Sequence, residues 1–313
     1  MGDRSGIEWT DATWNPVTGC NKVSEGCKNC YAEKMAKRLQ AMGAPRYANG
    51  FKVTLHPDVL TKPLHWTRPR RVFVDSMADL FHPEVPFEFI DKLFGVMALA
   101  QWHVFQVLTK RPERMRAYFT EKDARGWRAQ SRIYAAVRET EMPPGKFASE
   151  CGWPLKNVWL GVSVENQRRA DERIPLLLQT PAAVRFLSCE PLLGPLDLTP
   201  HLGEIRVCDN PRHGQLCPEG VTKAADGTIL CRYCKRPVER IRPLHLIIAG
   251  GESGPGARPM DPEWARSLRD QCEESGTPFF FKQWGGTRVA AGGHEEALLD
   301  GALWKQMPAT AMP

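Results

Sequence analysis

The stretch Val104-Phe105-Gln106-Val107-Leu108-Thr109-Lys110 shows the pattern from which the fold can be predicted. A short, nearly continuous apolar run that ends in polar residues suits a strand buried on both faces, as in a parallel sheet. Runs of the same kind recur at residues 72–76, 158–163, 184–189, 244–250 and 278–282. The sequence therefore predicts one buried sheet built from these runs.

Helical patterns separate the runs. Segments 86–101, 168–179 and 261–275 carry apolar residues at helical spacing, and the last has Pro262 at its start and Gly276 just after its end. Alternation of strands and helices indicates βαβ units, hence a barrel or a doubly wound sheet. The runs are too few for a closed eight-stranded barrel. We therefore expect an α/β fold, a partial TIM-type (β/α)6 barrel.

The domain organisation follows from where this rhythm is interrupted. We expect residues 1–286 to form the barrel unit, with inserts at 121–156 and 206–242, and residues 287–313 to form a C-terminal tail. The insert at 206–242 carries four cysteines, whereas the insert at 121–156 is polar and contains Gly and Pro.

Composition narrows the class of protein. The 313 residues are 42% hydrophobic and 25% charged, which is ordinary for a globular protein. No apolar stretch is long enough for a membrane span, and the first residues lack the apolar core of a signal peptide, so we expect a cytoplasmic protein without a membrane partner. The net charge of +6 permits a polyanionic partner. Ten cysteines in such a chain indicate metal binding rather than disulfides.

Three of these cysteines, Cys20, Cys27 and Cys30, lie close together near the N-terminus without a fourth. A structural zinc site and most iron–sulfur clusters take four protein ligands. Three ligands leave one iron of a [4Fe-4S] cluster open, as radical chemistry on S-adenosylmethionine requires. The alternative is a zinc knuckle completed by a distant residue such as Cys189.

A second group of cysteines lies in the late insert. Cys208, Cys217, Cys231 and Cys234 form two pairs, which favours a four-thiolate zinc ribbon, with His213 as a substitute for Cys208 or Cys217. An auxiliary iron–sulfur cluster is the alternative. The insert is also rich in Arg and Lys, and the segment 61–71 places Trp66 among basic residues, as a surface that binds nucleic acid would. A solvated face would carry the same charges.

Several longer strings resemble a known family. They are EWTDATWNPVTGC at 8–20, FVDSMADLFH at 73–82, VLTKRP at 107–112, LSCEPLL at 187–193, GGESGPGARP at 250–259 and FFKQWG at 280–285. On these strings the chain resembles the phage Gp37/Gp68 family (DUF5131-type), which is related to the radical S-adenosylmethionine superfamily and is distantly similar to spore photoproduct lyase. The match covers roughly residues 6–286 outside the two inserts.

The resemblance implies a partial barrel of the radical S-adenosylmethionine type, with its [4Fe-4S] cluster on Cys20, Cys27 and Cys30. The spacing of the late cysteines adds to this barrel a small inserted zinc-ribbon-like element. The six residues between the first two cysteines depart from the three of the commonest motif. In α/β barrels the functional side chains follow the strands. The resemblance suggests that cofactor-binding groups are to be sought at Tyr31, Asp75, Ser76, Ser163, Glu165 and the loop Gly250, Gly251, Glu252 and Ser253.

The remaining polar residues at strand ends are candidates for catalysis. They are Lys110, Glu190 and Cys189, the last as a hydrogen donor unless it is simply a buried thiol. The expected function is generation of a 5′-deoxyadenosyl radical that modifies, rearranges or repairs a nucleobase in DNA, as an isomerase or lyase, in the host cytoplasm if the protein is phage-encoded. An electron donor such as a flavodoxin is implied. The alternatives are a non-catalytic, metal-stabilised nucleic-acid-binding protein and a radical enzyme acting on a peptide or small metabolite.

Overall fold

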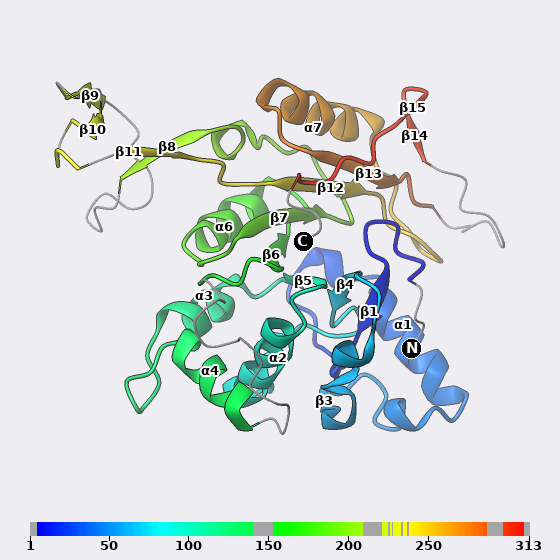
Figure 1. The fold of residues 1–313 in the computed structure, drawn as a ribbon. Coiled ribbons are helices and arrows are strands. Elements are labelled where there is room, and N and C mark those ends of the chain that lie inside the picture. The colour runs from blue at the N-terminus through cyan, green and yellow to red at the C-terminus, as the bar shows by residue number, and fades with distance from the viewer. Residues whose placement is uncertain are drawn as a thin grey trace.

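A curled sheet of seven parallel strands forms the centre of the molecule in the computed structural model (Figure 1). The structure describes residues 5–139, 153–208 and 221–286, without 225, 227, 233 and 237, and residues 297–309. In spatial order the strands are β1 (Ala12–Trp14), β4 (Arg71–Val74), β5 (Val104–Thr109), β6 (Val158–Ser163), β7 (Val184–Cys189), β12 (Leu246–Gly250) and β13 (Phe279–Gln283).

The strand order runs in the same direction as the chain from β1 to β13, and each neighbouring pair is parallel. A doubly wound sheet would reverse this order at a switch point. The sheet is thus wound in one direction, as a barrel is, and forms a half-barrel. The apolar runs of the sequence account for six of these seven strands. β1 was missed because its three residues precede the cysteine stretch directly and form no apolar run of their own.

Helices follow the strands and confirm the predicted alternation. The segments predicted at 86–101, 168–179 and 261–275 form α2 (Phe87–Leu99), α6 (Gln167–Leu178) and α7 (Pro262–Ser275). The Asp261 side chain caps α7, and Gly276 ends it with φ at 63°, in the left-handed region that glycine adopts without strain. The other helices are α1 (Tyr31–Ala41), α3 (Pro112–Thr120) and α4 (Ala129–Glu139), with short 3-10 turns at 25–27, 45–47, 57–59, 62–65 and 199–201. In the described part of the chain, no helix is long and apolar enough to cross a membrane.

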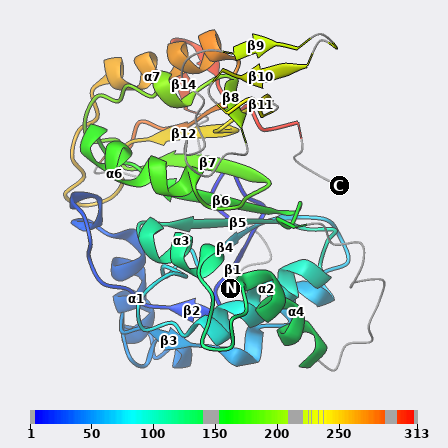
Figure 2. The same cartoon turned by 90° about the vertical axis from the view of Figure 1, so that its left-hand side faces the viewer.

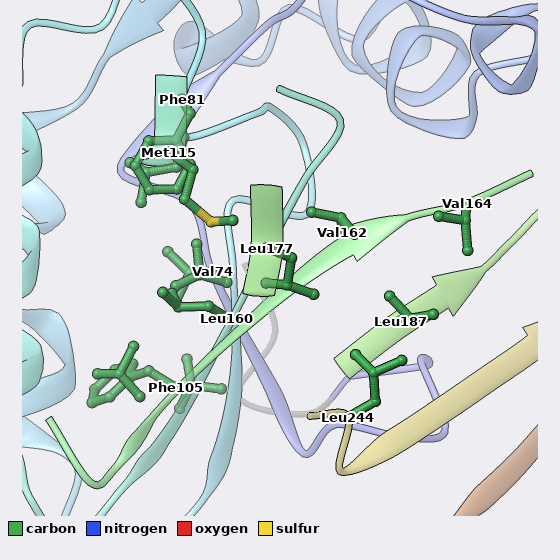
Figure 3. Packing of buried hydrophobic residues seen from close by; sticks show 14 of the residues in the cluster. Val74, Phe81, Phe105, Met115, Leu160, Val162, Val164, Leu177, Leu187 and Leu244 are labelled. Carbon is green, nitrogen blue, oxygen red and sulfur yellow. The ribbon is translucent and has the colours of Figure 1, made fainter. Parts of the chain in front are cut away.

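The main hydrophobic core lies between the outer face of the sheet and these helices. Alternate strand residues such as Val74, Phe105, Leu160 and Leu187 belong to one buried cluster with residues of α2, α3, α6 and α7. Leu177 of α6 lies near these strand residues (Figure 3). All of these side chains are almost completely buried. At about 25 cal/mol per Å² of apolar area, this layer supplies most of the stability of the sheet.

The inner face of the sheet divides into an apolar and a polar half. Near the amino ends of the strands, Trp9 packs with a second, smaller apolar cluster that includes Trp159, Phe186, Ile248 and Phe280. The ring of Trp9 lies 6.3 Å from that of Phe186. Near the carboxyl ends, the positions of the same face are polar, and they include Lys110, Ser163, Glu165, Ser188, Glu190 and Lys282. This polar half is the place where a barrel fold carries its chemistry.

The inserts and the tail add to this frame. The insert at 121–156 contains α4, which packs on α2, so it is not only a polar loop. The late insert forms an antiparallel ribbon of β8 (Ile205–Cys208) and β11 (Val238–Ile241), with β9 (Val221–Lys223) and β10 (Ile229–Cys231) at its far end (Figure 2). Short pairs are formed by β2 (Val17–Thr18) with β3 (Thr54–Leu55) and by β14 (Leu298–Leu299) with β15 (Ala302–Leu303). In the tail, Lys305 bonds to the Phe281 carbonyl oxygen and pairs with Glu8.

Candidate functional site

The loop that carries the three cysteines lies between β2 and α1. Its start is fixed by backbone hydrogen bonds from the Gly19 N–H to the Met77 carbonyl and from the Cys20 N–H to the Phe51 carbonyl. Gly19 has φ at 88°, and a Cβ there would lie 2.7 Å from the Phe51 oxygen, so this turn needs glycine. The three thiols are free and half-buried. The loop is thus held beside the segment that follows β4.

Cys20 contacts a buried ion pair at the end of β5. The Arg111 Nη1 lies 3.4 Å from Cys20 Sγ and 2.9 Å from Asp79 Oδ2. Burial and the Asp79 charge raise the pKa of the Cys20 thiol, while Arg111 opposes this effect. The guanidinium therefore compensates for a thiolate in a site that would otherwise disfavour one.

Cys27 is joined to β6 through Ser24. The Ser24 hydroxyl lies 3.8 Å from Cys27 Sγ and donates to Glu165 Oε1 at 2.6 Å. Glu165 is completely buried, and its other oxygen accepts from Arg173 Nη1 at 2.9 Å. A Cβ on Gly26 would lie 2.5 Å from the Glu165 Cγ, so the loop fits against this carboxylate without space to spare.

Cys30 follows a residue that is bonded to the loop after β12. Asn29 Nδ2 donates to Glu252 Oε2 at 2.8 Å and to the Gly256 carbonyl. Arg258 also donates to both oxygens of Glu252, and its hydrogen bonds lower the pKa of that carboxyl to about 2. The loop is thus held close to each cysteine by a carboxylate–arginine pair, and the three pairs lie at the carboxyl ends of different strands.

Glu25 fixes the middle of the loop to α6. Its carboxylate accepts from Arg169 Nη2 at 2.8 Å and from Asn166 Nδ2 at 2.6 Å. Hydrogen bonding to Arg169 lowers the pKa of Glu25 to about 2. The carboxylate therefore stays ionised across the physiological range.

Lys110 and Glu190, two of the predicted catalytic residues, lie on the polar half of the inner face. Lys110 Nζ donates to Ser163 Oγ at 3.1 Å and lies 4.0 Å from Glu165 Oε1. Glu190 pairs with Lys282 at 2.8 Å and accepts from the Ser188 hydroxyl. At this edge the ends of β5 and β13 thus present cations, and the ends of β6 and β7 between them present carboxylates.

Asp75 has the least satisfied side chain of the predicted cofactor-binding set. It follows β4 with φ at 56°, its Oδ1 accepts from the Val17 N–H, and its buried Oδ2 has no hydrogen-bond partner among the described residues. Burial raises the pKa of this carboxyl well above its ordinary value. Ser76 donates to Asn15 Oδ1, and Tyr31, at the start of α1, is 62% exposed and outside the core. An unpartnered buried carboxyl oxygen suits a ligand that brings a donor.

The Gly250–Ser253 loop was expected to approach a cofactor or substrate with its backbone. In the structure Gly251 approaches the chain itself, because a Cβ there would lie 2.7 Å from the Trp284 carbonyl carbon. Ser253 bonds to Gln283, and Gly250 leaves room for Glu190. Gly251 therefore serves the close approach of this loop to the residues after β13, and Gly250 leaves space for the Glu190 carboxylate.

Cys189, the third predicted catalytic residue, points away from the inner face. It is completely buried in the outer core together with Cys272 of α7, and burial raises the pKa of its thiol. This position favours the buried thiol over the hydrogen donor. It also argues against Cys189 as a fourth ligand for Cys20, Cys27 and Cys30.

The second cysteine group is described only in part. Cys231 is buried and Cys234 half-buried, and the Lys235 N–H donates to the Cys231 carbonyl in a tight turn in which Lys235 has φ at 59°. Arg232, Lys235 and Arg236 around this turn are exposed. The Cys208 side chain, His213 and Cys217 lie outside the described residues.

The segment 61–71 is not an exposed stacking surface. Trp66 is only 8% exposed, and Lys62 and Arg70 lie over its ring at 5.8 and 5.1 Å. The segment also precedes β4, at the amino ends of the strands and opposite to the cysteine loop. The expectation that Trp66 stacks on bases was wrong, because its ring covers the core instead.

The cysteine loop offers three thiol groups as possible metal ligands. Within the residues described, no three His, Cys, Asp or Glu side chains are gathered closely enough for one metal ion. Ligands of a four-iron cluster bind different irons, so their sulfurs stand farther apart than the ligands of a single ion. Three free thiols on one loop, with an arginine beside the first, are therefore candidate ligands for such a cluster.

Sequence reasoning missed the residues that hold this loop. Asp79, Arg111 and Arg258 lie within the strings that carried the family resemblance, and this was the available signal for them. Ser24 and Arg173 carried no signal, because their role depends on meeting Glu165 in space.

Comparison with known proteins identifies a family. The family described as "Protein of unknown function (DUF5131)" matches residues 4–308. No curated protein and no solved structure matches the chain.

Proposed function

The chain belongs to the DUF5131 family, and from this premise we propose that it is a radical S-adenosylmethionine enzyme whose [4Fe-4S] cluster is held by Cys20, Cys27 and Cys30. The observation that carries the proposal is the arrangement of the cysteine loop. It lies at the carboxyl edge of a half-barrel wound in one direction, and three carboxylate–arginine pairs connect it to three strand ends.

The residues around the loop suit the binding of the cofactor. A reduced cluster would supply an electron that cleaves the sulfonium bond of S-adenosylmethionine and gives a 5′-deoxyadenosyl radical. Asp75 Oδ2 lacks a donor and would accept one from the methionyl amine of the cofactor. Lys110 and Ser163 present a cation and a hydroxyl for the carboxylate or ribose. Tyr31 offers an exposed ring for the adenine.

The proposal includes a second metal site, in the late insert. The turn at Cys231 and Cys234 leaves both sulfurs on one short loop, as in a zinc knuckle, and we assign the zinc to these residues with Cys208 and Cys217. Such an insert is too small to bury a core, so a metal would supply its folding free energy. An auxiliary iron–sulfur cluster is the alternative occupant.

Nucleic acid is the proposed substrate class, and a nucleobase the proposed target. Support comes from the net charge of +6 and from the exposed Arg232, Lys235 and Arg236 beside the cysteine turn, which would contact phosphates. The reaction needs an external electron donor such as a flavodoxin. A peptide or a small metabolite is the competing substrate class.

Anaerobic reconstitution with iron and sulfide tests the proposal. The protein should take up four irons per cluster on the loop, show the electron paramagnetic resonance signal of a reduced cluster, and cleave S-adenosylmethionine under dithionite. Cys27→Ala should lose the signal and the cleavage. Cys272→Ala, a matched change of a buried thiol in the outer core, should keep both. A full cluster without cofactor cleavage would refute the radical enzyme and leave a metal-stabilised binding protein.

Two further measurements separate the sites and the substrates. Cys231→Ala should keep the loop cluster and lose zinc, whereas equal loss of loop iron from Cys231→Ala and Cys27→Ala would contradict two independent sites. A deuterated oligonucleotide should transfer its label to 5′-deoxyadenosine. Label transfer from a deuterated peptide instead would assign the competing substrate class.

A further inference from the structure

Arg111 occupies an unusual position for a cation, because it is buried against a predicted cluster ligand. Its exposed fraction is 8%. Nη1 donates to Cys20 Sγ at 3.4 Å and to Asp79 Oδ2 at 2.9 Å, while Nη2 donates to the carbonyl and side-chain oxygens of Asn21. One guanidinium therefore binds the sulfur of Cys20 and the backbone next to it.

The guanidinium is held rigidly from behind. Asp79 Oδ1 accepts from the Thr109 hydroxyl at 2.6 Å and from the Phe81 N–H at 3.0 Å, and Oδ2 also accepts from the Lys110 N–H. The Arg111 N–H donates to Thr109 Oγ1 at 2.9 Å. These bonds connect the loops after β4 and β5, so Arg111 cannot turn away from Cys20 without breaking several of them.

The contact distinguishes Cys20 from the other two cysteines. The neighbour of Cys27 is the neutral hydroxyl of Ser24. Among the contacts of the described residues, the sulfurs of Cys27 and Cys30 receive no N–H from arginine or lysine, whereas Cys20 receives one. Among the described residues, the contact between a cationic N–H and a loop sulfur is therefore made at Cys20.

Hydrogen bonds and positive charge at a ligating sulfur stabilise the more negative, reduced form of an iron–sulfur cluster, and so raise its reduction potential. We propose that Arg111 is a positioning residue that raises the reduction potential of the cluster through its N–H contact with Cys20. This inference rests on the proposed function, because it requires a cluster on the loop. It adds a named residue that determines how readily the cluster accepts its electron.

The test is a redox titration of the reconstituted cluster, followed by electron paramagnetic resonance. Arg111→Met should lower the midpoint potential by at least 59 mV, which is a tenfold change for a one-electron couple. Arg111→Lys keeps the positive charge without the planar guanidinium group, and its midpoint potential should lie between those of Arg111→Met and the wild type. The double variant Asp79→Asn with Arg111→Met removes both charges. Its midpoint potential should stay below that of the wild type, because the N–H that donates to the Cys20 sulfur is still missing.

A matched control separates the contact from a loss of fold. Arg132 and Asp91 form another buried ion pair, with Nε 3.2 Å from Oδ2, on α4 and α2 away from the cysteine loop. Arg132→Met should lower Tm, as Arg111→Met does, and leave the midpoint potential unchanged. A merely structural role of Arg111 predicts the same potential in both variants.

The outcomes distinguish this inference from the proposed function. A wild-type protein that forms no cluster refutes the proposed function and the inference together. A wild-type cluster whose potential is unchanged in Arg111→Met overturns the inference alone. If Arg111→Met does not retain iron, the inference is tested with Arg111→Lys and with the double variant. Midpoint potentials equal to that of the wild type in both variants overturn the inference, and lowered midpoint potentials support it.

Discussion

Replacing Gly26 by alanine tests the fit of the cysteine loop against Glu165. Gly26 has no positive φ, so alanine adopts the backbone conformation without strain, and the effect comes from the added methyl group alone. That Cβ would lie 2.5 Å from Cγ and 2.8 Å from Cδ of Glu165. Ordinary carbon contacts are at 3.5–4.0 Å, so one partner must retreat by about 1 Å.

Glu165 cannot retreat at low cost, because its side chain is completely buried and holds Ser24 and Arg173. Overpacking of this kind costs about 1–3 kcal/mol, and a hydrogen bond to a charged group contributes about 1.5–3 kcal/mol. We expect a loss of about 3 kcal/mol in the free energy of unfolding. For a chain of this size, Tm should fall by about 2 °C per kcal/mol, or about 6 °C.

The assay is thermal unfolding of the purified protein, with iron content after reconstitution as the second readout. Gly194→Ala is the matched control, because a Cβ there meets only Asn166 Cβ at 3.5 Å, an ordinary contact. We expect this control to remain within about 1 °C of the wild type. If Gly26→Ala matches the control in Tm and takes up as much iron as the wild type, the close fit between the loop and Glu165 is refuted.

Two more predictions concern buried charge and pH. Glu165→Gln leaves Arg173 buried without its carboxylate, and chemical denaturation should show a loss of about 3–5 kcal/mol in the free energy of unfolding. The control is Glu172→Gln, which removes the exposed carboxylate of a pair with Arg169 on α6 and should cost less than about 1 kcal/mol. Similar losses in the two variants would contradict a buried ion pair. Burial lowers the pKa of His245 from 6.5 to about 4, so the unfolded chain binds the proton more readily, and the stabilisation present above pH 6.5 should be lost as the pH falls toward 4. The expected loss is about 2 kcal/mol once partial solvent exposure is allowed for, and His245→Asn should flatten this part of the stability curve; an unchanged curve would show that the residue does not titrate as described.

The sheet could be predicted from the sequence because its central strands are continuous apolar runs. Runs such as 104–110 and 158–163 are largely apolar on both faces, and this pattern can be recognised without knowing which strands lie beside them. β1 could not be found in this way. Its three residues are a strand only because β4 lies beside them, with Trp14 opposite Val74.

The candidate site was predictable where a residue type carries its own chemistry. Spacing alone singled out the cysteines, and the ends of the strands indicated Lys110, Ser163 and Glu165. The pairing of Glu165 with Ser24 joins positions 141 residues apart, and no local pattern encodes such a contact. For Trp66 a local pattern was present but misleading. The basic, aromatic segment around it indicated an exposed binding surface, whereas its ring is buried beneath Arg70 and packs in the core.

The position of Trp9 has a consequence for the order in which the molecule is completed during synthesis. Trp9 is made before every strand of the sheet, yet its apolar surroundings include Phe186 of β7 and Phe280 of β13. Chains emerge from the ribosome N-terminus first, and long-range contacts of this kind form late. The earliest strands can therefore pair while translation continues, but the N-terminal segment reaches its final position only after β13 has been synthesised.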